Sequence, residues 1–378
     1  MNQATVEFRH VTKQYGPQGA VVDLSLLVPA GDICVLVGPS GCGKTTSLKM
    51  VNRLVEPSSG QVLIDGEDIM SVEVTALRRR IGYVIQQVGL FPHQTIADNV
   101  ATVPRLLGWP GERIQRRTEE LLELVGLDPG RIRQRYPSQL SGGERQRVGV
   151  ARAMAAEPPV MLMDEPFGAV DPIVRERLQN EFLRLHRTLG TTVLFVTHDI
   201  DEAIKMGSRV AVMQQGGHLA QYAPPTELLA HPANEFVSRF VGVDRGLKRL
   251  SLLKVADVKV ESGVVAHVGE PTEAARARAL QADSEWVLLL DRNHTPMGWV
   301  RSSQLGSDET LNAEHVDASS PLVHEETTLR DALSMLLTSA VQTAVVVDER
   351  GQYMAVLTLD EIGLAFRADP APEAAAVT

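Results

Sequence analysis

One segment of this chain has the residue types and spacing that hold phosphate groups. It runs from Gly38 to Thr45, reads GPSGCGKT, and fits the P-loop pattern G-x-x-x-x-G-K-[ST]. The glycines let backbone N–H groups turn inward around phosphates, Lys44 supplies a positive charge, and the Thr45 hydroxyl can hold Mg²⁺. An apolar run at residues 33–37 predicts a buried strand before the loop, and residues 45–54 predict a helix after it. Strand, glycine loop and helix are the arrangement that a phosphate site requires; a glycine turn without a ligand is the alternative.

A second glycine-rich turn, reading LSGGE, spans Leu140 to Glu144. It is expected to open a helix over residues 144–156, and the N-terminus of a helix is favourable for an anion. Each of these two segments is only half of a nucleotide site. We therefore predict that a second copy of the chain completes each site.

The elements that must position these residues follow an α/β pattern, because strand-like and helix-like segments alternate over about the first 240 residues. Residues 160–163 predict a buried strand that ends at Asp164 and Glu165, and residues 191–196 predict another that leads to His198. In open α/β sheets, ligands lie beyond the carboxyl ends of the strands. We expect the P-loop lysine, the two carboxylates and the histidine to meet at one rim.

The types of the rim residues suggest a role for each of them. Asp164 suits the Mg²⁺ shell opposite Thr45, since this cation prefers oxygen ligands. Glu165 could polarise an attacking water, and His198 could contact the terminal phosphate or orient Glu165. The alternatives are a solvated acidic strand end and a hydrogen-bonded loop histidine.

The composition narrows the class of protein. A length of 378 residues suggests two or three domains, and a formal net charge of -10 with pI near 5.5 argues against a nucleic-acid partner. The two cysteines, Cys34 and Cys42, do not suggest a disulfide framework. No run approaches the roughly 18 apolar residues of a membrane helix, and the N-terminus lacks a signal-peptide pattern. If the chain works at a membrane, we expect another chain to span it.

With all these motifs in this order, residues 5–240 resemble the ATP-binding subunits of ABC transporters. The resemblance implies a homodimer stacked head to tail, which ATP closes and hydrolysis reopens. Catalytic roles are implied for Glu165 and His198, and Glu144 stands where many members have glutamine. The implied ATP contacts within one copy are Tyr15 (stacked on adenine), Gly38, Pro39, Ser40, Gly41, Cys42, Gly43, Lys44, Thr45, Thr46, Gln86 and Asp164, with Thr45, Gln86 and Asp164 around Mg²⁺. The implied contacts to the ATP of the other copy are Ser141, Gly142, Gly143, Glu144 and Asp171.

Two further assignments in this region rest on the resemblance. Gln86 is chosen over Gln87 as the glutamine that contacts Mg²⁺, because it directly follows an apolar strand. Residues 89–96 place apolar and aromatic side chains around a proline. They are either a loop that covers the core or a docking surface for a helix of a membrane subunit.

After Val243 the nucleotide motifs end, and a basic stretch at residues 245–249 is interpreted as a solvated linker. Residues 314–366 show a β-α-β-β-α order that resembles a CBS domain, a module that works in pairs and often binds adenine nucleotides. Residues 250–305 resemble a looser copy. Where CBS modules carry Ser/Thr and then Asp, the second copy has Thr358 and Glu361 and the first has Arg301 and Gln304, so a nucleotide site and a purely structural role both stay open. Residues 367–378 are expected to form a disordered tail.

The predicted architecture is therefore an α/β P-loop NTPase (ABC ATPase) domain over residues 1–243, with a helical signature subdomain, followed by a tandem α+β CBS pair. This combination, with residues 51–54 and 81–96, resembles the ATP-binding subunits of quaternary-amine importers, which take up glycine betaine, choline, carnitine or proline betaine. The implied partners are transmembrane permease subunits and, indirectly, an external solute-binding protein, at the cytoplasmic face of the membrane. The alternatives are an importer of another small solute and a soluble, non-transport ABC ATPase.

Overall fold

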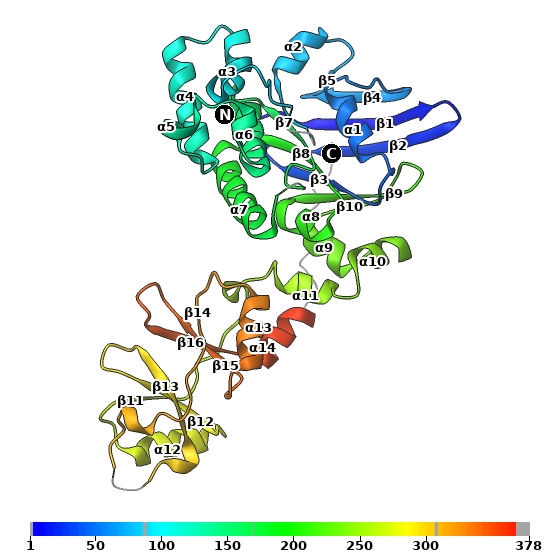
Figure 1. Cartoon of the computed structure of the whole chain (residues 1–378). Helices are drawn as coiled ribbons and strands as arrows, with labels where there is room; N and C mark the ends of the chain where they lie inside the picture. The colour runs from blue at the N-terminus through cyan, green and yellow to red at the C-terminus, as the bar shows by residue number, and fades with distance from the viewer. Residues whose placement is uncertain (1–2, 86–88, 169, 307–308, 368–378) are drawn as a thin grey trace. The chain divides into compact units, whose positions relative to one another are not determined.

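The computed structural model describes residues 3–85, 89–168, 170–306 and 309–367 (Figure 1). The chain divides into two compact units, residues 1–242 and 243–378, which are described separately. Gln86 and most of the predicted tail, residues 368–378, lie outside the described residues. In the part of the chain that is described, no helix is long and apolar enough to cross a membrane.

A six-stranded sheet forms the centre of the first unit, and three of its strands end at the predicted rim. β3, β8 and β7 are adjacent and parallel, and every residue of these strands is buried. Continuous apolar sequence is what a strand covered on both faces requires. The sheet order is β10 (His218–Ala223), β9 (Arg209–Gln214), β3 (Ile33–Val37), β8 (Thr192–Thr197), β7 (Val160–Asp164) and β6 (Ile81–Val84).

A second, antiparallel sheet shares the apolar core of the first. Its order is β2 (Gln18–Val28), β1 (Val6–Tyr15), β4 (Ser59–Ile64) and β5 (Glu67–Asp68). Phe8 and Leu24 of this sheet are fully buried together with Leu36 and Leu162 of the central sheet. The two sheets therefore form one hydrophobic core, and β1 carries Tyr15 to the edge of that core.

The helices of this unit fall into two groups. α3, α4 and α6 pack on one another and gather with α5 to one side of the sheets (Figure 1). α1, α7 and α8 each follow or precede a strand of the central sheet, as α/β order requires. The bounds are α1 (Lys44–Val51), α2 (Val74–Arg79), α3 (Ile96–Leu106), α4 (Gly111–Leu124), α5 (Pro129–Ile132), α6 (Gly142–Met154), α7 (Pro172–Leu189), α8 (Ile200–Met206), α9 (Pro225–Ala230) and α10 (Glu235–Val241), with a 3₁₀ turn η1 at Pro137–Gln139.

The bounds of α1 and α6 differ from the sequence prediction. α1 ends at Val51 rather than residue 54, because Arg53 adopts a left-handed φ of 52° and its guanidinium donates to the Val72 carbonyl at 2.9 Å. α6 begins at Gly142 rather than residue 144, because the cap is Ser141 and both glycines belong to the first turn. The signature turn is therefore the first turn of the helix itself.

The second unit contains two three-stranded sheets of the same design. In each, the first strand runs parallel to the second, which pairs antiparallel with the third. The first repeat has β11 (Val265–His267), α12 (Thr272–Gln281), β12 (Trp286–Leu290) and β13 (Pro296–Arg301). The second has β14 (Leu322–Val323), α13 (Leu329–Thr338), β15 (Thr343–Val347), β16 (Tyr353–Thr358) and α14 (Leu359–Arg367). Short 3₁₀ turns lie at Val255–Asp257 (η2), Ser302–Gln304 (η3) and Ala313–His315 (η4).

The two repeats also exchange segments. Ala318, which leads into the second repeat, bridges Trp299 of β13, and Glu261, which leads into the first repeat, bridges Val356 of β16. The same turn chemistry recurs, since Asp291 and Asp348 each accept two backbone N–H bonds after the second strand. The repeats are thus related by structure, and each is completed by the other.

The stretch predicted as a solvated basic linker is instead a helix, α11 (Arg245–Leu250). Leu250 is buried in the core of the second repeat. A Cβ on Gly246 would lie 2.5 Å from a ring carbon of Phe366, so the glycine allows α11 to approach α14 closely. The linker prediction was wrong because it considered only the charged residues and not the apolar ones between them.

Candidate nucleotide site

The loop between β3 and α1 has a backbone that only glycines can form. Gly38, Gly41 and Gly43 have φ values of 152°, 80° and 96°. A Cβ on Gly38 would lie 2.1 Å from the Met213 carbonyl oxygen, and one on Gly43 would lie 2.2 Å from the Ala20 carbonyl oxygen. Real Cβ atoms do not approach so closely, so the loop is a cradle whose glycines are required by sterics. This geometry fits the phosphate-binding prediction.

Lys44 places its charge inside this cradle. Its side chain is only 7% exposed, and Nζ donates to the carbonyl oxygens of Gly38 at 2.7 Å and Pro39 at 2.9 Å. A buried ammonium is costly unless it is paired, and the groups that accept from it here, two carbonyls and the Cys42 sulfur, are neutral. The cation is therefore held at the loop, where an anionic phosphate would be a stronger partner. Cys42 is fully buried, and its Sγ lies 3.6 Å from Nζ of Lys44.

Thr45 and Asp164 meet as the sequence predicts. The Thr45 hydroxyl donates to Oδ1 of Asp164 at 3.0 Å, from the start of α1 to the end of β7. Burial raises the pKa of Asp164, while the Thr45 hydrogen bond and, more weakly, the charges of Lys49 and Lys44 act in the opposite direction. A hydroxyl and a carboxylate are the oxygen donors that suit Mg²⁺, so this pair fits the predicted metal site.

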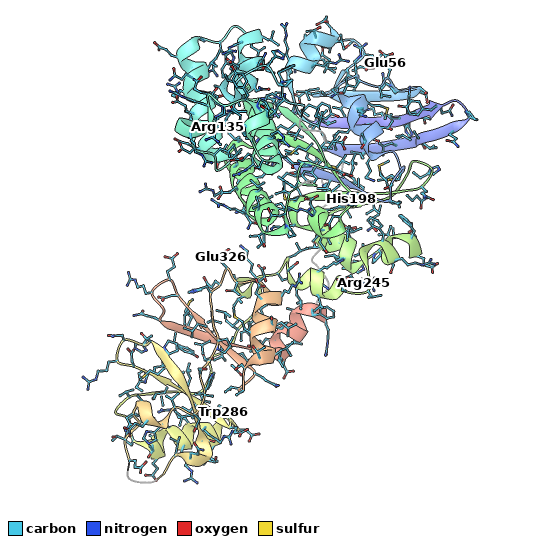
Figure 2. All side chains as sticks on the ribbon, viewed as in Figure 1. Glu56, Arg135, His198, Arg245, Trp286 and Glu326 are labelled. Atoms are coloured by element: carbon cyan, nitrogen blue, oxygen red, sulfur yellow. The ribbon has the colours of Figure 1, made fainter. Side chains whose placement is uncertain are left out.

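Glu165 and His198 also meet at the rim. His198 Nδ1 lies 3.1 Å from Oε1 of Glu165, and the Glu165 backbone N–H donates to the Val196 carbonyl at 3.0 Å. Glu165 adopts a left-handed φ of 46°, a backbone conformation that residues other than glycine seldom adopt. Figure 2 shows His198 at the turn before α8. The structure thus brings together the carboxylate and the histidine that the sequence placed at two strand ends.

The remaining predicted contacts within one copy that the structure describes lie on β1, on the loop after β3 and on α1. Tyr15 is 54% exposed at the end of β1, and the Lys13 ammonium lies 5.1 Å from its ring centroid, so the ring is accessible for stacking. Ser40 and Gly41 lie on the exposed side of the loop, and Thr46 lies in the first turn of α1. Gln86 lies outside the described residues, so the Gln86 prediction stays a prediction.

The signature turn is closed on itself by a capping box. The Ser141 hydroxyl accepts from the Glu144 N–H at 3.3 Å, and Oε2 of Glu144 accepts from the Ser141 N–H and hydroxyl, both at 2.9 Å. Hydrogen bonds from Ser141 hold the pKa of Glu144 below its ordinary value, with a smaller contribution from Arg131, whose guanidinium lies 3.4 Å away. A Cβ on Gly143 would meet nothing within 4 Å. The turn therefore presents an open surface of small residues.

Two features of this region were not predicted from the sequence. Asp171 caps α7 by accepting from the Val174 N–H at 3.1 Å, so its carboxylate has a structural bond within its own chain. Arg131 supplies the countercharge of Glu144 from 13 residues earlier. No motif spacing signals this pair, because it depends on how α5 lies against the start of α6.

A groove lies next to the segment that was considered for docking. It has a volume of about 330 Å³ and contains Phe91, which is 40% exposed. The Arg152 guanidinium donates to the Gly89 carbonyl at 2.7 Å and fixes one end of the segment. Other lining residues come from α2, β6, α3 and the end of α6. The segment is thus one wall of an open groove.

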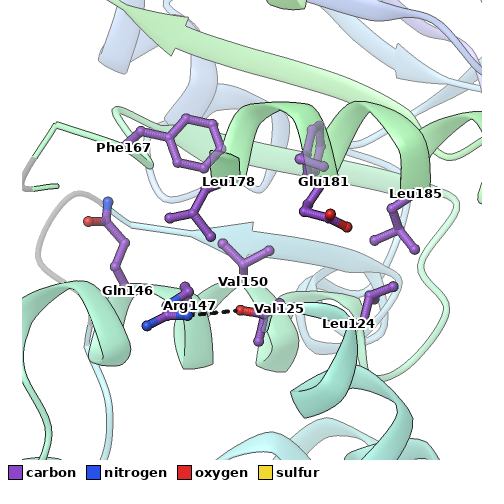
Figure 3. A pocket seen from close by; sticks show the side chains of 10 residues that line it. Leu124, Val125, Gln146, Arg147, Val150, Phe167, Leu178, Glu181 and Leu185 are labelled. Carbon is purple, nitrogen blue, oxygen red and sulfur yellow. Dashed lines mark hydrogen bonds between the residues drawn. The ribbon is translucent and has the colours of Figure 1, made fainter. Parts of the chain in front are cut away.

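A separate, mainly apolar crevice lies between α4, α6 and α7 (Figure 3). Leu124, Val150 and Leu185 line it, and the dashed line in Figure 3 marks the Arg147 bond to the Val125 carbonyl, 3.3 Å long. Its enclosed volume is only about 30 Å³. The crevice has neither the glycine cradle nor the lysine of the P-loop, so we do not assign the nucleotide to it.

Comparison with known proteins agrees with this geometry. The family described as "ABC transporter" matches residues 21–168. The osmoprotectant import ATP-binding protein OsmV of Salmonella typhimurium is 46% identical over 94% of this chain and 95% of its own length. The glycine betaine/carnitine/choline transport ATP-binding protein OpuCA of Bacillus subtilis is 41% identical over 93% of this chain and 94% of its own length.

A solved structure shows the same fold for the first unit. The dimeric structure of MJ0796, a bacterial ABC transporter cassette, is 33% identical, covers 58% of this chain and 98% of its own, and has a TM-score of 0.54. With the P-loop cradle, the Thr45–Asp164 pair and the signature turn, these matches define an ATP-hydrolysing cassette. The chain belongs to the ABC transporter family. It is an ATP-binding subunit, an ATPase coupled to transport.

Proposed function

We propose that this chain powers the import of quaternary-amine osmoprotectants through a separate membrane permease. The observation that carries the proposal is similarity over almost the whole chain, second unit included, to relatives named for osmoprotectant, glycine betaine, carnitine and choline transport. A spermidine/putrescine import protein of Nitrosomonas europaea is 44% identical but covers only 63% of this chain. The similarity to the osmoprotectant, carnitine and choline relatives cited above thus extends over more of this chain than the similarity to this polyamine import protein.

The chemistry that we propose at the rim uses the contacts already described. The backbone N–H groups of residues 38–45 and the Lys44 ammonium hold the phosphates. Glu165 orients the attacking water and accepts its proton, and His198 holds the Glu165 carboxylate at 3.1 Å. The water oxygen bonds to the terminal phosphorus while the bond to the leaving ADP oxygen breaks. When bound, Mg²⁺ neutralises charge on the phosphates, and Thr45 and Asp164, with Gln86, would hold it.

The dimer that we propose completes each site with the signature turn of the other copy. Ser141, Gly142 and Gly143 would meet the terminal phosphate, with Glu144 and Asp171 next to them. The open space around Gly143 and the position of Ser141 at the N-terminus of α6 support this role. A structure of MJ0796 described as dimeric and bound to ADP and Pi, with 33% identity to this chain, offers further support.

The groove beside Phe91 is the surface that we propose for a permease helix. Its apolar and arginine side chains suit an amphipathic helix laid into it. Such docking would hold the chain at the cytoplasmic face of the membrane as a peripheral subunit. Contact with an external solute-binding protein would then be indirect, through the permease, and no nucleic-acid partner is proposed.

For the second unit we propose a regulatory CBS pair, with repeats at residues 250–305 and 314–366 after an ATPase domain of residues 1–243. The matching strand orders and exchanged segments support this assignment. An adenine nucleotide would have to compete for Glu361, whose Oε1 accepts from the Glu261 N–H at 3.0 Å and whose Oε2 accepts from the Thr358 N–H at 2.6 Å. A structural role or a response to ionic strength is therefore the other outcome of a nucleotide titration.

Reconstituted uptake tests the proposed function. The chain would be co-expressed with its permease, and uptake of labelled glycine betaine would be measured with choline, carnitine, proline betaine and spermidine as competitors. Competition by the quaternary amines supports the proposal, whereas competition by spermidine alone would indicate another solute. A chain that never co-purifies with a permease would be a soluble, non-transport ABC ATPase. Removing residues 243–378 and repeating uptake across a salt series tests the regulatory role.

A further inference from the structure

A buried carboxylate that the rim chemistry does not use lies between α7 and α8. Glu202 is 9% exposed, and its Oε1 accepts from Nε2 of Gln179 at 2.9 Å. Gln179 is itself 5% exposed. Burial raises the pKa of Glu202, while hydrogen bonds from Thr197 and Gln179 act in the opposite direction. A buried carboxylate is costly unless its partners fix it, so the arrangement holds these side chains in one geometry.

The same carboxylate reaches the turn that carries His198. The Thr197 hydroxyl, 2% exposed at the end of β8, accepts from the Asp199 N–H at 3.0 Å and also acts on Glu202, whose pKa it lowers. Asp199 in turn accepts from the Glu202 N–H at 3.3 Å. His198 therefore lies between two residues that both interact with Glu202.

On its other side, the network belongs to α7. Gln179 is in α7, whose first residue follows Asp171. The Arg175 guanidinium donates to the Val170 carbonyl at 3.1 Å and also lowers the pKa of Glu202 through its charge. Val170, α7 and the His198 turn are thus connected around one buried side chain.

We propose that Glu202 is a positioning residue for ATP hydrolysis, which sets His198 relative to α7 through Thr197 and Gln179. His198 is 64% exposed in its side chain and has little packing of its own to fix it, so the residues on either side must hold it. This inference rests on the proposed dimer in one respect. If Asp171 contacts the other copy, the network lets that contact bias the position of His198.

The alternative is that Glu202 only stabilises the packing of α8 against α7, with no effect on His198. The chain offers a control for this, because Lys205 Nζ and Oε1 of Glu176 lie 3.7 Å apart and join the same two helices at the surface. The Glu176 side chain is 72% exposed, unlike the buried Glu202. A substitution at Glu176 changes the helix–helix contact and leaves the His198 turn as it is.

The test is steady-state ATP hydrolysis by the full chain carrying Glu202→Gln, Thr197→Val, both changes, or the control Glu176→Gln. We expect kcat to fall about tenfold in each single variant, the size of a lost hydrogen bond to a charged group. KM for ATP should stay within about twofold, since the P-loop is untouched. The double variant should fall about tenfold rather than a hundredfold, because both changes break one link.

Each other result overturns the inference. Unchanged kcat in the Glu202 and Thr197 variants would show that the turn does not need the network. Additive losses, or losses shared by Glu176→Gln and matched by a lower melting temperature, would show only a fastening role. Thr197→Val keeps the side-chain shape, so it tests the link even if Glu202→Gln does not fold. An inactive unmodified chain would instead count against the proposed function.

Discussion

The P-loop rim and the signature turn both combine glycines with the start of a helix, yet their polar groups are satisfied in different ways. At the rim, Lys44 and Asp164 are buried, and although Lys44 bonds within its own loop, Asp164 is bonded to Thr45, which lies 119 residues away in the sequence. At the signature turn, Ser141 and Glu144 bond mainly to each other, near the surface. The rim therefore depends on a contact between distant segments of the chain. The signature turn is held by bonds within the turn itself, and its outer face is open to another molecule.

The largest expected effect comes from removing the Glu165 carboxylate. Glu165→Gln keeps the size of the side chain but loses a general base, and turnover should fall roughly 10²–10⁴-fold. ATP binding should be retained and the closed dimer trapped. Phosphate release measures turnover, and size-exclusion chromatography with ATP measures dimerisation. Normal turnover would remove Glu165 from the catalytic role.

A matched pair of alanine substitutions tests the difference directly. Gly38→Ala should abolish nucleotide binding and lower the melting temperature, because the new Cβ would lie 2.1 Å from the Met213 carbonyl oxygen. Gly143→Ala should leave the melting temperature unchanged or slightly raised, since its Cβ has open space and alanine favours helix. Its effect should appear only in ATP-dependent dimerisation, measured in the Glu165→Gln background. Equal loss of nucleotide binding in both variants would contradict the comparison.

A smaller effect is expected from the charges at the signature turn. Arg131→Gln removes the stronger of the two arginine charges that act on the Glu144 carboxylate and should weaken ATP-dependent dimerisation a few-fold. Glu144→Gln should strengthen it by a similar factor, because one negative charge is removed near the phosphates. The double variant should return to the unmodified value. Dimer dissociation at two salt concentrations measures this, and equal effects at both would argue against a role of charge.

The smallest effect concerns pH. Hydrogen bonds from Ser141 lower the folded-state pKa of Glu144, so its capping contribution is present above the unfolded pKa of about 4.5 and is lost as pH falls through the lower folded value. The contribution should be about 0.5–1 kcal/mol, typical of a cap. The free energies of unfolding of the unmodified chain and Glu144→Gln, measured with denaturant, should differ at pH 7, and the difference should shrink as pH falls below 4.5. A difference in the free energy of unfolding that did not change with pH would show that the effect of the substitution does not come from the charge of Glu144.

Much of the ATPase unit was predictable because its buried strands have uninterrupted apolar sequence. Residues 33–37 form β3 as predicted, and the strands that end at Asp164 and at Thr197 lie next to it. The rule that ligands lie beyond strand ends then brings Glu165 and His198 together, and the structure confirms their contact.

What could not be predicted depends on contacts between distant segments. The Arg131–Glu144 pair and the Glu202–Gln179 bond link helices whose separation in sequence carries no pattern. The early end of α1 depends on a left-handed Arg53 and its bond to Val72. The α11 helix was mistaken for a linker because its apolar contact, Phe366, lies more than a hundred residues away.

The exchanged bridges of the second unit have a consequence for how this chain can be shortened. Because Trp299 pairs with Ala318 and Val356 pairs with Glu261, a cut between the two repeats removes a neighbour from each sheet and bares its edge. A shared apolar cluster, with Leu288 and Val345 fully buried, would also be opened to water. Deleting one repeat therefore also destabilises the repeat that remains. A shorter protein that still folds would have to lose both repeats in one deletion.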